Sequence, residues 1–557
     1  MSEAGTIISR IYSGFRGVDF RGDEINLVRS PDSLNVWKDY RETESIRTRP
    51  GLERKHQHTY PVYGIFEYNG SILYHTNNTL RKADPAGNIL LYTGLAKNPS
   101  QAFIFDNILY IKDGEKYLQY DGTTVKDVEG YVPTTSIGRK PSGGGTIHED
   151  VNMLTGRRIN TFLADGISFD FFLDAQNLDT DFAPIVKVDD KVVTGYTVDY
   201  TKGKISFTKA PNAPKTDGRD NVSVEFSKTI SKYKNCILKC TLLQVFDNRV
   251  FFSGNPDYPN MVWHCSLEDP TYCSDLDYYK DGQDTAPVKG LVAGNNALWV
   301  FREPSSANTT VFYHTPTIDS DYGKIYPSAH SSISTGCVGK AINFNDDIVF
   351  FSDRGMEGIS GDVTTEQMVA HRSTLVDRKM LSEADYKSMV LAEWEGYLMV
   401  FIGTKVFLAD SRATFTNETH MEYEWFYWDL GKQVTSACVV GGVLYLGTTD
   451  GLYTLTGKSD VESYWVTPMD KFKNPSRLKT TNKRGCVVEA TGDISVYAKI
   501  EDTDFELIGN YENITDYFVC RIKRKKFKDL QLKFHSTKRF SLETATIEAF
   551  VGGYIKR

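Results

Sequence analysis

Seven short stretches of this chain share one pattern of apolar and polar positions. In each, a few apolar residues lead into a turn of Asn, Asp or Gly, and two to four apolar or aromatic residues follow. These turn residues tolerate the positive φ of a two-residue turn, and the flanks suit half-buried strands, so each stretch predicts a β-hairpin. The stretches span residues 66–74, 103–110, 245–252, 291–300, 344–351, 394–400 and 439–446.

The spacing of these hairpins predicts what they build. Their turns align on Asn69, Asn107, Asn248, Asn296, Asp347, Gly396 and Gly442. The separations are about 38, 141, 48, 51, 49 and 46 residues, and a β-propeller blade takes about 40–50 residues. All but the long gap fit one blade each, and the long gap fits one blade plus an insertion of about 85 residues. The pattern predicts an all-β chain, a six- or seven-bladed propeller with a guest domain.

The guest domain is predicted at residues 142–230, where the hairpin pattern is absent. Period-two alternation at 167–173, 184–200, 203–214 and 221–227 is broken by Asp189-Asp190, by Lys202-Gly203 and by prolines, which is typical of a small β-sandwich. The run from Ser142 to Gly145 predicts a flexible hinge that opens it.

The rest of the chain divides around these two features. Residues 1–60 predict an extended N-terminal arm, 61–141 and 231–464 the two parts of the propeller, and 465–557 a C-terminal β-domain. The stretch 364–390 has helical spacing and predicts one or two short helices, the second capped by Ser382.

Arg47 and Arg49 flank a Pro50-Gly51 turn at the end of the predicted arm. Charged residues beside a turn are usually solvated, which is the favoured interpretation. The alternative is that the arm lies on a neighbouring subunit and uses these arginines there.

Composition supports the all-β prediction and limits the partners. The chain has 557 residues with 32 Tyr, 31 Phe and 44 Gly, which suits many short strands and tight turns. A net charge of −8 argues against a main surface that binds nucleic acid. No stretch reads as a signal peptide or membrane span, so we expect synthesis in a cytoplasm. The eight scattered cysteines are expected to be buried free thiols.

No constellation predicts chemistry. The spacings of Cys236, Cys240, Cys265 and Cys273 lack the paired Cys-x-x-Cys of structural zinc, and there is no phosphate loop, EF-hand or nucleophile elbow. Asp189-Asp190 and Asp346-Asp347 are interpreted as turn formers. Residues 352–359 (SDRGMEGI) resemble part of the Asp-box turn of sialidases without its aromatic residue, which makes a glycosidase the best enzymatic alternative. We predict no enzyme and no catalytic, cofactor-binding or metal-binding residue.

Two kinds of cluster leave alternatives open. The basic residues Arg521, Lys523, Arg524, Lys525, Lys526 and Lys528 lie in a strand-like run. They either protect a strand edge, the favoured interpretation, or contact DNA or an acidic neighbour. The aromatic stretches 256–265 and 423–430 either wedge between blades, which is favoured, or stack on sugar rings.

Several of these segments together resemble a known family. They are GFRGVD at 14–19, SPDSLNV at 30–36, RTRPG at 47–51, SGNPDYPN at 253–260 and FFSDRGMEGISG at 350–361. The combination resembles tail proteins of tailed bacteriophages, in particular the nozzle (tail tubular protein B) and head-to-tail stabilisation proteins of short-tailed phages. The resemblance covers the arm, the blades and the insertion, and the last ninety or so residues match only in being β-rich.

The resemblance implies a structural role. Such proteins form a ring, commonly a hexamer, below the portal and adaptor; DNA passes through it transiently, and it supports fibres or a tip. The expected location is the virion tail after assembly in the host cytoplasm, with no membrane insertion and no cofactor. A mildly acidic chain suits a channel that must not bind DNA tightly, since a lumen lined by lysines would bind the phosphates and slow the passage of DNA. The alternative is a propeller that binds or cleaves a host-surface glycan.

Overall fold

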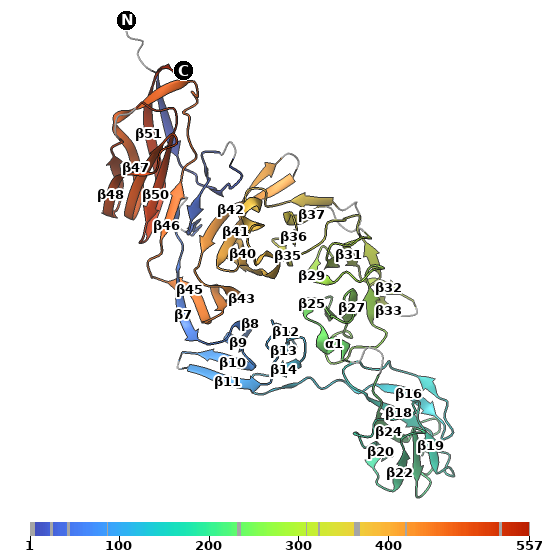
Figure 1. Ribbon diagram of the computed structural model, residues 1–557. Helices are drawn as coiled ribbons and strands as arrows, with labels where there is room; N and C mark the ends of the chain where they lie inside the picture. The colour runs from blue at the N-terminus through green and yellow to red at the C-terminus, as the bar shows by residue number, and fades with distance from the viewer. Residues whose placement is uncertain are drawn as a thin grey trace. The chain divides into compact units, whose positions relative to one another are not determined.

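The computed structural model describes residues 6–22, 26–41, 45–85, 87–230, 235–307, 309–320, 323–360, 368–417, 420–522 and 526–555, the side chains of Lys483 and Arg484 aside. The chain divides into two compact units, one made of residues 1–93 and 335–557 and the other of residues 94–334. Strands dominate both units (Figure 1).

Four-stranded antiparallel sheets recur along the described residues, four in the first unit and three in the second. Those of the first unit are β8–β11 (Val62–Tyr68, Ser71–Thr76, Thr79–Asp84, Gly87–Thr93), β35–β38 (Ala341–Phe344, Asp347–Ser352, Gly355–Ser360, Met368–His371), β39–β42 (Val390–Trp394, Tyr397–Ile402, Lys405–Asn417, His420–Asp429) and β43–β45 (Val434–Val440, Val443–Thr448, Gly451–Gly457) with β7 (Gly51–Gln57). Those of the second unit are β12–β15 (Gln101–Phe105, Ile108–Lys112, Tyr117–Tyr120, Val125–Asp127), β25–β28 (Leu242–Phe246, Arg249–Ser253, Met261–His264, Tyr278–Lys280) and β29–β31 (Val288–Gly294, Ala297–Arg302, Val311–His314) with β34 (Ser328–His330).

The fold is therefore all-β, a β-propeller built from blade-like sheets, as the sequence predicts. Each predicted hairpin forms the first two strands of one sheet, and both central turn residues have positive φ in all seven. In the fifth hairpin the turn residues are Asn345 and Asp346, with φ of 52° and 64°, so the prediction of Asp347 as a turn residue is wrong. Asp347 begins β36 and accepts hydrogen bonds from Arg372 Nε and the Tyr423 hydroxyl instead.

One blade is completed by the N-terminal region. Strand β7 pairs antiparallel with β45, which brings Arg54 opposite Tyr453 and His56 opposite Leu452. The sheet that β7 completes contacts β8 of the following blade through β43 and β44. The last blade is thus closed by a strand from near the chain's beginning.

The inserted domain is a sandwich of two sheets, and its core includes Phe162, Phe171, Val186, Ile205 and Phe226. One sheet has the order β17-β16-β18-β24-β20-β21 (Thr146–Ile147, Thr134–Arg139, Arg157–Phe162, Val222–Ser227, Ile185–Val188, Lys191–Val192), and the other has the order β19-β23-β22 (Asp170–Phe172, Lys204–Phe207, Tyr196–Asp199). Asp189 and Asp190 form the β20–β21 turn with φ of 49° and 60°, which confirms their interpretation as turn formers.

The predicted hinge at Ser142–Gly145 is wrong. Lys140 pairs with Gly143, and this turn joins β16 to β17 inside the inserted sheet. The domain is fastened to blade β25–β28 elsewhere, by Asn152. Its Nδ2 donates to the carbonyls of Tyr131 and Thr271 at 2.8 Å, and its Oδ1 accepts from the Cys273 amide at 3.1 Å.

The C-terminal domain is a ten-stranded sheet that includes four strands of the predicted arm. Its path is β4-β46-β50-β47-β51-β6-β5 (Ser33–Leu34, Ser463–Val466, Leu530–Ser536, Arg477–Ile500, Phe540–Tyr554, Ile46–Thr48, Val36–Lys38), with β1 (Ile7–Tyr12) on β51 and with β48 and β49 (Glu506–Ile514, Tyr517–Cys520) on β47. Two short pairs, β2–β3 (Gly17–Val18, Arg29–Ser30) and β32–β33 (Thr317–Asp319, Gly323–Ile325), complete the strands.

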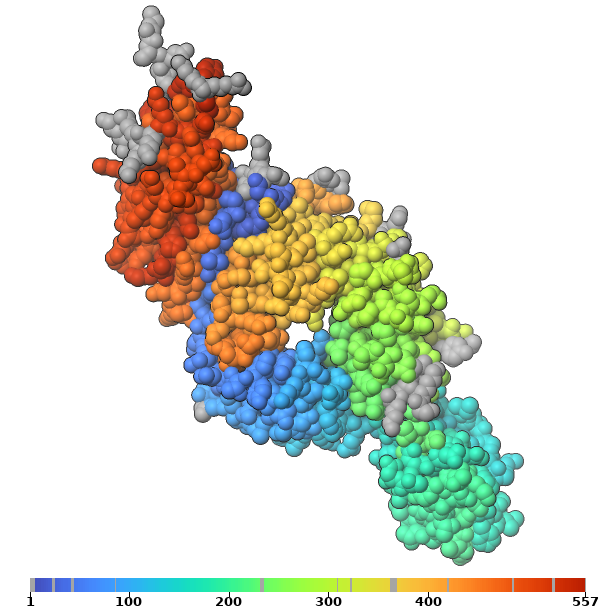
Figure 2. Space-filling view, in the orientation of Figure 1, coloured from blue at the N-terminus to red at the C-terminus, as the bar shows by residue number. Residues whose placement is uncertain are grey.

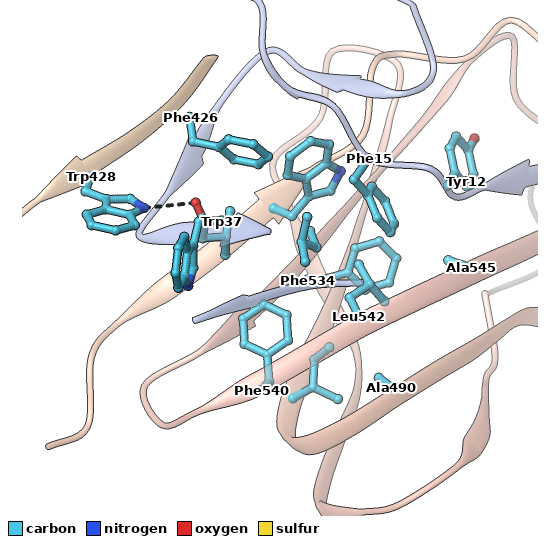
Figure 3. Packing of buried hydrophobic residues seen from close by; sticks show 14 of the residues in the cluster. Tyr12, Phe15, Trp37, Phe426, Trp428, Ala490, Phe534, Phe540, Leu542 and Ala545 are labelled. Atoms are coloured by element: carbon cyan, nitrogen blue, oxygen red, sulfur yellow. Dashed lines mark hydrogen bonds between the residues drawn. The ribbon is translucent and has the colours of Figure 1, made fainter. Parts of the chain in front are cut away.

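One apolar core joins the arm, the C-terminal sheet and two blades of the first unit. Trp37 of β5 stacks on Trp394 at 5.2 Å between ring centroids and meets Trp428 edge-on at 5.8 Å. The Trp428 Nε1–H donates to the Val36 carbonyl at 3.0 Å, drawn as a dashed line in Figure 3. In the space-filling view the blue arm residues lie against orange residues of these blades and of the C-terminal sheet (Figure 2).

Helices are few and short. The described part of 364–390 contains α2 (Asp377–Met380) and the 3₁₀ turn η1 (Tyr386–Ser388), as the spacing predicts, and α1 spans Cys236–Lys239. The predicted cap is wrong, because the Ser382 hydroxyl donates back to the Lys379 carbonyl and the N-cap residue of η1 is Asp385. No helix in the described ranges is long and apolar enough to span a bilayer.

Candidate functional site

The aromatic stretches singled out in the sequence belong to the core. Trp263, Trp425 and Trp428 are fully buried, and Phe426 and Tyr427 are buried beside them. The interpretation of these stretches as wedges between blades is confirmed, because no indole among them is presented to solvent for stacking on a sugar.

All eight cysteines are free, and all but Cys438 are buried. Burial raises the pKa of the Cys236 thiol to about 12 and that of Cys520 to about 11, so these sulfurs stay protonated and unreactive. The described residues contain no group of three or more His, Cys, Asp or Glu side chains placed to hold a metal ion.

The SDRGMEGI segment contributes to a partly buried ionic cluster. Glu357 Oε2 lies 3.2 Å from His371 Nδ1, and Asp377 Oδ2 lies 2.6 Å from His371 Nε2. Burial opposes the charge on His371, but hydrogen bonds to the two carboxylates outweigh it and raise the pKa to about 10. An imidazolium whose two nitrogens both donate hydrogen bonds to carboxylates cannot act as a base near neutral pH. The cluster instead links β38, which carries His371, to α2, which carries Asp377.

A second buried cluster, in the other unit, has the composition of a catalytic triad but not its geometry. His314 Nε2 lies 3.0 Å from Asp281 Oδ2, and His314 Nδ1 donates to the Tyr326 carbonyl at 2.9 Å. The Ser328 hydroxyl donates to Asp281 rather than to the histidine. Since both imidazole nitrogens are engaged, nothing activates the serine, and the cluster is structural.

One of the two arm arginines, Arg49, differs from the favoured interpretation. Arg49 is only 5% exposed, and it donates to Asn35 Oδ1, the Pro50 carbonyl and the Asp429 carbonyl, each at 2.9 Å. Burial lowers the pKa of its guanidinium to about 10. Its interpretation as a solvated charge is therefore wrong, because these three acceptors hold the side chain in the interior, where it ties the arm to β42 of its own chain.

The basic run of the C-terminal domain is only partly described. Lys523, Arg524 and Lys525 lie outside the described residues, while Arg521, Lys526 and Lys528 are exposed. The run follows β49 and precedes β50, so its described residues lie in a connection between strands. The favoured interpretation, that they protect a strand edge, is therefore wrong for these residues.

The outer face of the C-terminal sheet carries several exposed large apolar side chains among polar ones such as Glu548, and it is the candidate functional site. Register places Ile11, Thr546, Val487 and Val519 side by side across β1, β51, β47 and β49. A second row pairs Ile7 with Phe550. The large exposed side chains of this face, called here the outer apolar face, are Ile7, Ile11, Tyr517, Val519, Phe550 and Tyr554.

Alternation explains why these side chains share one face. In β1, Ile8, Arg10 and Tyr12 point to the core, where Arg10 Nε lies 2.8 Å from Asp470 Oδ2, and Ile7, Ser9 and Ile11 therefore point outward. Ile11 is 58% exposed and Tyr517 is 66% exposed.

Strand β1 also lies at an edge of the sheet. Among the described strands it pairs only with β51, so the backbone groups of its other side have no strand partner. An edge strand that carries exposed Ile residues is a surface that soluble proteins usually cover. Sequence reasoning missed this face, although the apolar residues on both parities of 7–12 are a signal for it.

Comparison with protein-family models gives no match, and comparison with curated proteins gives none either. Among solved structures, the computationally designed Ika8 protein is 11% identical, with 73% of this chain and 98% of that chain covered and a TM-score of 0.32. BamB from Moraxella catarrhalis is 10% identical, with 73% and 96% covered and a TM-score of 0.32. An exo-β-1,3-galactanase from Phanerochaete chrysosporium is 11% identical, with 55% and 94% covered and a TM-score of 0.23. Similarities this low carry no functional conclusion, and the resemblance to phage tail proteins stays a prediction.

Proposed function

We propose that the protein is a structural component of a phage tail. In this proposal its subunits form a ring, the nozzle, which extends the DNA-ejection channel below the portal and adaptor and supports fibres or a tip. The observation that carries the proposal is the outer apolar face, because it calls for a protein partner. The sequence resemblance in the arm and blades identifies the kind of assembly.

The energetics favour a covered face. Fully burying one large apolar side chain stabilises by about 1.5–3 kcal/mol, so covering side chains that are already half buried gains about 1 kcal/mol each. Six such side chains on one face would contribute several kilocalories per mole to an association. Lost translational and rotational freedom opposes this gain by about 4–15 kcal/mol, so a ring also needs further contacts between its subunits.

Assembly state tests the proposal. The mass of the purified protein is measured by size-exclusion chromatography with light scattering, and particles are imaged by electron microscopy. We expect a multi-subunit ring. Ile11→Lys and Tyr517→Lys place a charge on the outer apolar face and should shift the protein towards smaller species, whereas Ser388→Lys, at an exposed position outside this face, should not.

Two outcomes would contradict the proposal. One is a wild-type protein that stays monomeric both alone and with a portal–adaptor complex. The other is a ring that survives both face substitutions in variants whose near-ultraviolet circular dichroism is unchanged. A monomer that releases sugar from host cell wall would favour the glycan-cleaving alternative.

A further inference from the structure

A groove of about 660 Å³ lies at the seam between two adjacent blades of the first unit. One wall comes from β7 and the other from the blade β8–β11, at the start of β9 and at the β10–β11 turn. These strands are drawn in blue in Figure 1. Its volume is within the range of small-molecule sites, about 300–1,000 Å³.

The floor of the groove is the apolar contact between the two blades. Ile72 and Leu452 are buried in one cluster, and Ala83 and Tyr445 pack against it. The same four side chains line the groove, so a ligand resting there meets a continuous apolar surface.

The walls carry positive charge. Arg54, Lys55, His56 and Lys82 line the groove, together with one carboxylate, Asp84. His56 is placed by its register opposite Leu452 and by a stack with Tyr74 at 6.1 Å. Burial and then Lys55 lower the pKa of its imidazole, so it is neutral at pH 7 and adds a hydrogen-bonding group rather than a charge.

Two of these cations, Arg54 and Lys82, form no ion pair with another described residue. Lys55 is engaged, since its Nζ lies 2.6 Å from Glu53 Oε1. Arg54 and Lys82 have no ion-pair partner among the described residues. On a chain with a net charge of −8, these two cations outnumber the one carboxylate of the groove, Asp84, and make its surface locally attractive to an anion.

We propose that this groove binds a sugar that carries an acidic group, either a carboxylate or a phosphate. The apolar floor with the Tyr445 ring suits the C–H face of a pyranose, Arg54 and Lys82 pair with the acid, and Ser71 and Asp84 bond to hydroxyl groups. A bare anion would leave the floor unused, and a neutral sugar would leave both cations unused. The inference does not depend on the proposed ring.

Four probes test the inference on the full chain by isothermal titration calorimetry and saturation-transfer NMR: glucuronate, glucose 6-phosphate, glucose and inorganic phosphate. We expect glucuronate, glucose 6-phosphate or both to bind at least about tenfold more tightly than glucose and inorganic phosphate. Binding of only one of the two acidic sugars would assign the acid as carboxylate or phosphate. Binding should weaken as salt is added, because the groove is open to solvent.

A matched pair of double variants locates the site. Arg54→Gln with Lys82→Gln should weaken acidic-sugar binding about tenfold or more. Lys387→Gln with Lys458→Gln removes the same charge from exposed positions outside the groove and should leave binding unchanged. Equal binding of glucose or of inorganic phosphate, no binding of either acidic sugar, or equal effects of the two double variants would overturn the inference.

Discussion

Removal of one indole should release the arm from the rest of the first unit. Trp37 is 2% exposed, and its ring centroid lies within 6 Å of those of Trp394, Tyr397 and Trp428. Its strand, β5, pairs with β6, which in turn pairs with β51 of the C-terminal sheet. Trp37→Ala therefore leaves a large cavity where the arm, a blade and the C-terminal sheet meet.

The size of the effect follows from these contacts. Replacement of a buried Trp by Ala lowers the free energy of unfolding by about 3–5 kcal/mol, and this range already includes the loss of the aromatic contacts. Each 1.4 kcal/mol is a factor of about ten in an equilibrium constant, so the opening equilibrium of the arm should rise about 10²- to 4 × 10³-fold. The Trp37 Nε1–H has no acceptor among the described residues, so the change removes no hydrogen bond.

Hydrogen–deuterium exchange measured by mass spectrometry is the suitable assay, because a chain of several domains need not unfold in one step. Peptides covering residues 33–57 should exchange faster by the factor given above for the opening equilibrium, at least about 10²-fold. The exchange rates of peptides from the second unit should not change. Trp37→Phe, which keeps a ring in the stack, should cost only about 1–2 kcal/mol. A change of less than about tenfold in Trp37→Ala would refute the view that this indole holds the arm.

Three further changes test other parts of the structure. The pKa of His371 is raised to about 10, so its ion pairs contribute stability that is full below about pH 6.5 and is lost as the pH rises through 10; exchange from β38 should show this dependence, and His371→Gln should abolish it. Burial lowers the pKa of Lys112 to about 8, so the wild type should gain stability relative to Lys112→Met between about pH 8 and 10, measured by urea unfolding of each protein. Gly17 has φ of 118° and an added Cβ would lie 1.9 Å from the Trp425 carbonyl oxygen, so Gly17→Ala should cost about 3 kcal/mol or more in thermal unfolding; Gly14→Ala, with φ of 62° and open space, should cost only about 1–2 kcal/mol.

The parts of the fold that depend on local chemistry were predictable. Each hairpin is encoded in a few adjacent residues, such as Asn295 and Asn296, which adopt φ of 51° and 57° between two apolar strands. The same local logic misplaced the hinge, because Gly143, Gly144 and Gly145 supply positive φ for a hairpin turn as readily as freedom for a linker.

Non-local pairing explains most of what the sequence did not reveal. Arg49 reads as a surface charge, and it is buried because Asn35, 14 residues earlier, and Asp429, 380 residues later, surround it. The outer apolar face needs the register of β1 with β51, and the groove needs β7 beside β45, so neither was visible from spacing. The sequence of residues 7–12 gave a partial signal for the outer apolar face, since apolar residues occupy both faces of this strand.

The placement of the arm has a consequence for how the first unit forms. Strand β1 pairs with β51, and β7 with β45, so two sheets stay incomplete until segments separated by several hundred residues meet. Contacts of such large sequence separation form late, because loop closure must precede them. The blades β8–β11, β35–β38 and β39–β42, whose strands are consecutive in the chain, should fold first, and the closing blade and the C-terminal sheet should follow together. Because β1 and the outer apolar face belong to that late sheet, the surface proposed for ring assembly is complete only when the subunit itself has closed, which would keep partly folded chains out of the ring.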